Sequence, residues 1–100
     1  MTTQERFAQD YGMPLHKVKG MVRLASAAGK ANEKSCNGDR HPLSKYPEDK
    51  AHNAKLWDDE RNATTVAIAR MVEPFGFTGV EYTGLYPTLK RGDQFVEIPY

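Results

Sequence analysis

A single cysteine, Cys36, is present among the 100 residues of the chain. One thiol cannot form a disulfide within the chain, which excludes a disulfide-stapled fold and fits a reducing compartment. No apolar run approaches the roughly 18 residues that a membrane span needs. The polar N-terminus is not followed by the apolar segment of a secretory signal either. These absences lead us to expect a cytoplasmic protein that does not act at a membrane.

An excess of charge of one sign is also missing. The formal net charge is +1, with charged residues at 27% and hydrophobic residues at 39%, which is typical of an ordinary folded domain. The charges are unevenly placed, because residues 1–34 hold six basic and three acidic side chains (net +3), whereas residues 35–100 hold eight and ten (net −2). One hundred residues are enough for one hydrophobic core, so we expect a single domain over 1–100.

The first third of the chain predicts two helices that meet at a glycine. The first helix covers Thr3–Tyr11, with Thr2 or Thr3 as its N-cap, and Gly12 ends it because glycine readily adopts a left-handed conformation. Pro14 suits the first turn of the second helix, where its missing N–H would be unpaired in any case.

The second helix is predicted to run to about Lys34, with Gly29 as a weak point. Its apolar residues recur at helical spacing and form one face: Leu15, Val18, Met21, Val22, Ala25 and Ala28. Two prolines and an Asn-Gly pair then indicate a loop over Ser35–Pro47.

The longest helical stretch is predicted over Glu48–Val72, with a possible bend near Asn62 because the sequence DDERN is polar on every side. Pro74 and Gly76 end it. The side chains that we expect to be buried are Ala54, Trp57, Thr64, Ile68, Met71 and Val72.

The C-terminal region changes to strand-like composition. Gly79–Tyr86 and Gln94–Ile98 predict the two strands of an antiparallel hairpin, with a turn in the sequence PTLKRGD between them and a bulge at Gly84. The expected fold class is α+β, in which helices pack with a C-terminal hairpin. The expected organisation is a helical head (1–34), a loop (35–47), a long helix (48–73) and the hairpin (79–98).

The stretch Gln4–Arg23 resembles a helix-turn-helix. Ala8 is the small residue of the first helix and Gly12 stands four positions later at the turn. The motif's apolar positions are occupied by Phe7, Tyr11, Met13, Val18 and Met21. The resemblance covers about 20 residues and implies that residues 14–23 enter the major groove of DNA. It implies as DNA-contacting residues His16, Lys17, Lys19 and Arg23.

Two departures favour a plain two-helix corner instead. Leu15 stands where the motif usually exposes a polar residue, and no support helix precedes the stretch. The helix Glu48–Val72 would have to provide that support.

Other groups of residues give weaker support for a metal site or a catalytic site. Cys36, His41 and His52 could bind zinc with Asp58 or Asp59, but no closely spaced ligand pair such as C-x₂-C is present. A helical face shared by Glu48, His52 and Asp59 is more often solvated. A Cys36–His41 or Cys36–His52 nucleophile pair lacks a neighbour that would lower the pKa of the thiol, so we expect a loop cysteine. We predict no metal, no cofactor and no catalytic residue.

Aromatic residues gather in the C-terminal third, and some of them are candidates for partner contact because tyrosine is a good interface anchor. Alternation places Val80, Tyr82 and Tyr86 on one side of the first strand and Glu81, Thr83 and Leu85 on the other. Arg91-Gly92-Asp93 is interpreted as an ordinary turn. The predicted partner-contacting residues are Tyr82, Tyr86, Lys90, Arg91 and Tyr100.

The whole layout resembles small orphan proteins of bacteriophages and prophages. A short helical head, a loop with CNGD, one long helix and a closing GLYPTLKRGDQFVEIP segment carry this resemblance. It implies an accessory protein in the host cytoplasm that binds a host or phage protein, for example to inhibit a defence, replication or transcription machine. A small DNA-binding regulator is the alternative hypothesis, and a small enzyme or metal-binding protein comes third.

Overall fold

The fold combines three helices with a three-stranded antiparallel sheet, which confirms the α+β class. The computed structural model describes residues 1–100. The helices are α1 (Thr3–Tyr11), α2 (Leu15–Asn37) and α3 (Lys50–Val72), and a 3-10 turn, Glu73–Phe75, follows α3. The strands are β1 (Gly79–Tyr82), β2 (Pro87–Arg91) and β3 (Gln94–Val96).

The ends of α1 lie where the sequence predicts them. Thr2 is the N-cap, and its hydroxyl accepts a hydrogen bond from the Glu5 N–H at 3.1 Å while the Glu5 carboxylate accepts one from the Thr2 N–H at 3.2 Å. These bonds to Thr2 lower the pKa of Glu5. Gly12 closes the helix with φ of 65°. Both boundaries therefore follow from local chemistry.

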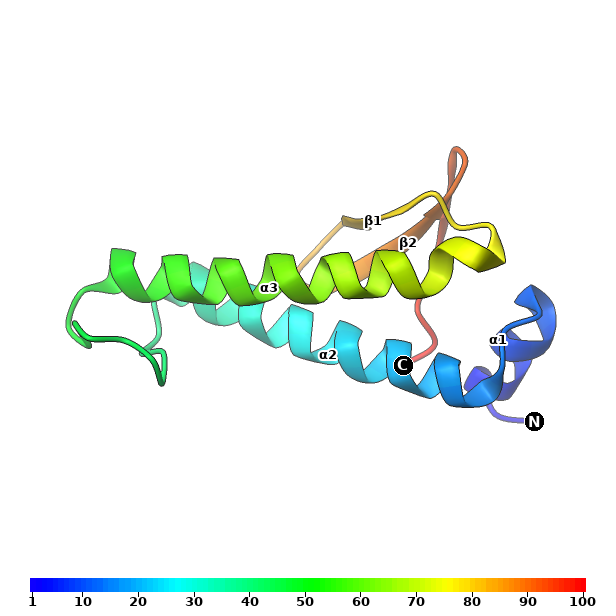
Figure 1. The fold of residues 1–100 in the computed structure, drawn as a ribbon, viewed down its shortest axis with the longest axis horizontal. Helices are drawn as coiled ribbons and strands as arrows, with labels where there is room; N and C mark the ends of the chain where they lie inside the picture. Colours follow the sequence, from blue (N-terminus) through cyan, green and yellow to red (C-terminus); the bar gives the residue numbers. More distant parts are fainter.

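Helices α2 and α3 form a long antiparallel pair (Figure 1). Near the loop end, the Ser35 hydroxyl bonds the Asp58 carboxylate at 2.5 Å, and toward the other end Gly20 lies beside Met71. The sheet lies behind this pair toward the α1 end, and the loop between α2 and α3 projects at the opposite end (Figure 1). The molecule is consequently elongated, with extents of 46 × 26 × 19 Å.

The second helix is longer than predicted. It continues past Lys34 to Asn37, so the predicted loop Ser35–Pro47 begins three residues too early, and Gly29 does not interrupt it. Gly38, with φ of 66°, ends the helix. Pro14 is the N-cap rather than a residue of the first turn. Tertiary contacts along the whole helix outweigh the modest helical cost of one glycine.

The third helix begins later than predicted and does not bend at Asn62. Asp49 caps it and accepts a hydrogen bond from the His52 N–H at 3.1 Å. Its polar middle is helical throughout, and there Arg61 donates to the Asn32 side-chain oxygen of α2 at 2.8 Å. Of the residues predicted to be buried, three are (Trp57, Ile68, Val72) and three are half-buried (Ala54, Thr64, Met71).

The predicted hairpin is wrong in its pairing. The strand order is β1-β2-β3, so the segment 87–91, interpreted as part of a turn, is the central strand. Gly79–Tyr86 and Gln94–Ile98 do not pair with each other. Gly84 lies in the connection between β1 and β2 and forms no bulge within a strand. The first residues of β1 (Gly79) and β3 (Gln94) and the turn at Gly92 and Asp93 are where the sequence indicates them.

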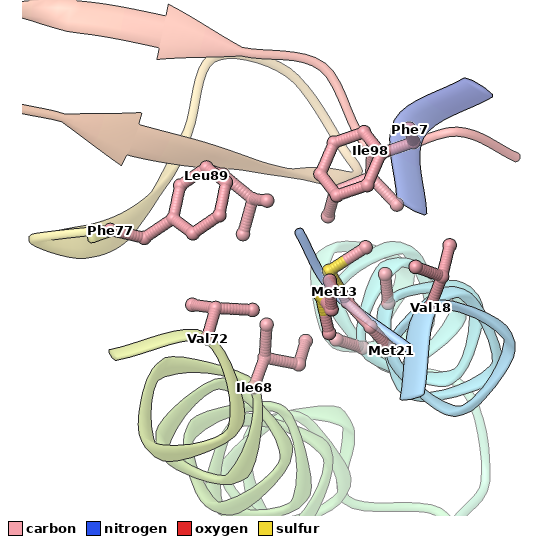
Figure 2. Close-up of a cluster of buried hydrophobic side chains, with 11 residues drawn as sticks. Phe7, Met13, Val18, Met21, Ile68, Val72, Phe77, Leu89 and Ile98 are labelled. Carbon is pink, nitrogen blue, oxygen red and sulfur yellow. The ribbon is translucent and has the colours of Figure 1, made fainter. Parts of the chain in front are cut away.

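The core lies between the inner face of the sheet and the α2–α3 pair (Figure 2). Leu89 points from β2 toward Val72 and Ile68 of α3, and Ile98 lies beside Phe7 above Met13 (Figure 2). The eleven buried members are Phe7, Met13, Val18, Met21, Ala25, Ala28, Ile68, Val72, Phe77, Leu89 and Ile98.

The connection between β1 and β2 is fastened to α2 at two adjacent points. The Asn32 side-chain amide donates to the Leu85 carbonyl oxygen at 2.9 Å. One helical turn earlier, the Tyr86 ring lies directly against Gly29, and a Cβ atom at position 29 would overlap that ring. Gly29 is therefore required by close packing rather than by backbone conformation.

Two glycine substitutions in α2 test this fastening. We expect Gly29→Ala to destabilise the protein by about 1–3 kcal/mol, because the Tyr86 ring must move. Gly20→Ala is the matched control, since its Cβ would meet only the Met71 methyl at 3.8 Å. It should stabilise by about 0.5–1 kcal/mol through helix propensity alone. Urea unfolding measures both, and equal effects of the two substitutions would contradict the Tyr86 contact.

Candidate functional site

The N-terminal corner joins α1 to α2 through a glycine turn. Gly12 adopts the left-handed conformation, and the carbonyl oxygen of Ala8 accepts the N–H of Gly12 and of Met13. The core contains four of the five apolar positions (Phe7, Met13, Val18 and Met21), while Tyr11 is half-buried. The second helix extends far beyond the motif, however, and lies along α3 for its length.

The four predicted DNA-contacting residues are all exposed, but they do not share one direction. The Lys17 ammonium lies over the Phe75 ring, 5.5 Å from its centre, beside the end of α3. The other three follow one another at helical spacing on the outer side of α2: His16, Lys19 and Arg23.

The three predicted tyrosines lie in two places. The Tyr82 hydroxyl is 2.6 Å from the Thr65 hydroxyl of α3, which holds that ring against the helix pair. Tyr86 and Tyr100 contact each other edge to face, with ring centres 5.7 Å apart, beside α2. They are 38% and 53% exposed. Tyr86 and Tyr100 therefore form a shared exposed surface.

The two predicted basic residues of the sheet have structural contacts. Lys90 pairs with Glu81 of β1 at 3.1 Å on the outer face of the sheet. The Arg91 guanidinium lies 5.6 Å from the centre of the Tyr11 ring, at the α1 end. The structure therefore does not bring the five predicted partner-contacting residues together.

The cysteine and histidines considered for zinc or nucleophilic chemistry remain apart. Cys36 is exposed on the last turn of α2, which corrects its predicted place in a loop. His52 lies against Tyr46 at a ring-centre distance of 5.3 Å. No group of three or more His, Cys, Asp or Glu side chains converges anywhere in residues 1–100.

His41 has a structural environment near the loop end of the helix pair. Its ring lies edge-on to Trp57 at 4.3 Å, and its Nδ1 accepts the Leu43 N–H at 3.1 Å. The Trp57 indole N–H donates to the Asp39 carbonyl oxygen at 2.9 Å. Asn53 is buried and was not among the residues predicted to be buried. Its side-chain oxygen accepts a hydrogen bond from the main-chain N–H of His41 at 3.4 Å. These bonds close the loop over the helix ends.

The largest hollow in the surface is a groove of about 670 Å³ between α1 and the C-terminal segment that contains β3. One wall is α1, and the other runs from Gln94 to Pro99. Arg6 and Asp10 of α1 and Glu97 opposite them contribute charges of both signs. Phe95, 53% exposed, stands at its β3 edge.

The strand β3 is an edge strand of the sheet. The Lys90 carbonyl oxygen is directed toward β1, where it accepts the Thr78 N–H at 2.8 Å. Main-chain groups of successive strand residues point to alternate sides, so the Lys90–Phe95 pair does not exchange hydrogen bonds. Phe95 therefore turns its own N–H and C=O toward the open edge, above the groove.

No protein-family model, curated protein or solved structure matches this chain. None of its three helices is both long and apolar enough to cross a bilayer. The function must accordingly be inferred from the surfaces that the fold builds.

Sequence reasoning missed the walls of the groove. Arg6 and Asp10 carry no motif, and Phe95 is one of several aromatic residues in the C-terminal third. The alternation of Gln94, Phe95 and Val96 could have indicated that Phe95 points away from the core. The pairing of α1 with β3, 83 or more residues apart in the chain, could not be read from a local pattern.

Tyr100 is the one side chain of this region with a strongly altered acidity. Partial burial of the phenol, followed by the proximity of the Tyr86 and Tyr82 phenols, raises the pKa of Tyr100 to about 12 from the ordinary value of 10.0. Its hydroxyl donates to the Pro87 carbonyl oxygen at 3.4 Å. The folded chain thus keeps this phenol neutral at a pH at which the unfolded chain ionises it.

This difference predicts a loss of stability in alkali. The contribution of Tyr100 is fully present below pH 10.0 and is lost as the pH rises toward about 12, because the unfolded state releases the proton first. We expect Tyr100→Phe to lose less stability than the wild type between these limits in urea unfolding. Tyr46→Phe, in the exposed loop, should follow the wild type. Parallel curves for Tyr100→Phe and the wild type would refute the prediction.

Proposed function

We propose that the protein acts without catalysis, by binding an extended segment of another protein along β3, over the groove between α1 and the C-terminal segment. The open N–H and C=O of Phe95 support this proposal most directly. An extended peptide can add to an exposed sheet edge through main-chain hydrogen bonds, while pockets beside the edge select its side chains.

The groove gives such a segment a place for alternate side chains. The buried side chains of Phe7 and Ile98 line it and favour the binding of an apolar side chain of the segment. The Arg6 guanidinium and the Asp10 carboxylate at the α1 wall favour polar or charged neighbours in the bound segment. Phe95 adds an exposed aromatic anchor of the kind that often dominates binding energy.

The layout of the chain suggests which kind of protein the bound segment belongs to. Small phage accessory proteins, which this layout resembles, act in the host cytoplasm by binding a host or phage protein. We therefore propose that the bound segment belongs to a host or phage protein, such as a component of a defence, replication or transcription machine. The groove replaces the dispersed set of Tyr82, Tyr86, Lys90, Arg91 and Tyr100 as the proposed contact surface.

Two substitutions of Phe95 distinguish the contribution of its ring to peptide binding from the contribution of its main-chain N–H. Peptides selected from a random library against the wild type should bind about tenfold more weakly to Phe95→Ala, which corresponds to ~1.4 kcal/mol. Phe95→Pro should bind more weakly still, because it also removes the N–H at the open edge, whereas the β2–β3 ladder does not use that N–H. Binding is measured by fluorescence anisotropy, and protection of the Phe95 amide in the complex by hydrogen exchange.

Leu43→Ala is the control, because Leu43 is an exposed apolar side chain in the loop at the opposite end of the molecule. It should bind the selected peptides as the wild type does. Equal binding by the wild type, Phe95→Ala and Phe95→Pro, with all melting curves unchanged, would refute the proposed site.

A further inference from the structure

The outer side of α2 carries a row of basic side chains. Its members are separated by three, four, seven and four residues, which places them on one helical face: His16, Lys19, Arg23, Lys30 and Lys34. Between Arg23 and Lys30, the same face is occupied by the small residue Ala27. All are exposed, and none forms an ion pair. The row extends roughly 27 Å along the axis at 1.5 Å per residue.

This face is open because the other sides of α2 are occupied. Ser35 and Gly20 mark the side against α3, and Gly29 marks the side against the sheet connection. The only acidic residue of α2 is Glu33, so the helix carries five basic side chains of Lys or Arg and one acidic one, net +4. The rest of the chain then carries −3, since the total is +1.

A carboxylate and an aromatic ring lie near two members of the row. Glu5 of α1 lies close enough to Lys19 for that ammonium to lower the pKa of the carboxyl, after the larger effect of the Thr2 hydrogen bonds. At the other end, the Lys34 ammonium lies over the Trp57 ring at 4.6 Å. Arg23 and Lys30, in the middle, have neither kind of contact.

Aromatic rings border the row on the side of the sheet. Tyr100 and Lys19 line one hollow together with Leu15 and the first residues of α1. Tyr100 and Tyr86 line a second hollow with Ser26 of α2. The Tyr100 ring thus shares a hollow with Lys19 of the row, and the Tyr86 and Tyr100 rings border α2 at Ser26.

We propose that this face of α2 binds single-stranded nucleic acid, with phosphates along the basic row and an unpaired base on Tyr100. Lysine and arginine neutralise phosphates, and tyrosine rings stack with bases that are not already stacked in a duplex. The negative charge of the remaining surface disfavours binding elsewhere. This mode differs from a helix-turn-helix, which would use the start of α2 and leave Lys30 and Lys34 without a role.

The test compares labelled oligothymidine with a duplex by fluorescence anisotropy over a range of salt concentrations. The wild type should bind the single strand more tightly, with an affinity that falls steeply with salt. Replacing Lys19, Arg23 and Lys30 together by glutamine should lower the salt slope by about 2, because each lost phosphate contact on a single strand removes about 0.7. Tyr100→Leu should weaken binding about tenfold without changing the slope.

The matched control replaces three exposed lysines outside the row, Lys45, Lys50 and Lys55, by glutamine. It alters net charge equally and should keep the wild-type slope. If the triple variant of the row melts early, Arg23→Gln alone should still lower the slope by about 0.7. Phe95→Ala should bind oligothymidine normally, which separates this proposal from the peptide groove.

Three results would overturn the proposal. One is equal salt slopes for the row variant and the control variant. Another is equal affinity for duplex and single strand, which would favour groove binding of duplex DNA. The third is no detectable binding of oligothymidine at low salt.

Discussion

The close approach of the β1–β2 connection to α2 is the constraint on which the arrangement of the molecule depends. Gly29 leaves room for the Tyr86 ring, and Asn32 holds the Leu85 carbonyl beside it. Pro87, the next residue, starts the central strand, so this contact fixes where the sheet lies over the helix pair. Leu89 then reaches the core, and Tyr100 reaches the side of α2 through its contact with Tyr86.

The short helix α1 borders both surfaces that we propose to be functional. Its first turn closes the hollow that contains Lys19 and Tyr100, whereas Arg6 and Asp10 form a wall of the groove beside β3. Phe7 anchors α1 to the core between them, where it stacks on Phe77 at 6.2 Å. One nine-residue helix, held by the rings of Phe7 and Tyr11 and by its capping bonds, therefore separates a mixed-charge groove from a basic face.

Elements with strong end signals were predictable from the sequence. Thr2, Gly12 and Pro74 set helix ends by local chemistry, and the structure has α1 and the end of α3 where those residues indicate. The central strand was not predictable in the same way, because only Pro87 and Leu89 of its five residues are buried and the rest resemble a turn. The continuation of α3 past Asn62 is accompanied by the bond between Arg61 and Asn32, a contact between helices that no local pattern shows.

The candidate surfaces likewise include features that follow from local sequence spacing and features that depend on tertiary contacts. Helical spacing alone could have extended the row from His16, Lys19 and Arg23 to Lys30 and Lys34. No spacing could have shown that Tyr82 turns toward Thr65 while Tyr86 turns toward Gly29, because the connection between them bends back over α2. The edge character of β3 likewise depends on the identity of the central strand.

The position of Trp57 has a practical consequence for spectroscopy. It is the only tryptophan of the chain, and it lies beside His41 near the loop, outside the cluster that joins the sheet to the helices. Its emission will therefore report on the loop end of α2 and α3, whereas circular dichroism averages over all three helices. If that end frays before the remainder, the two signals will give different transition midpoints, and the discrepancy will measure how tightly the two ends of one elongated molecule are coupled.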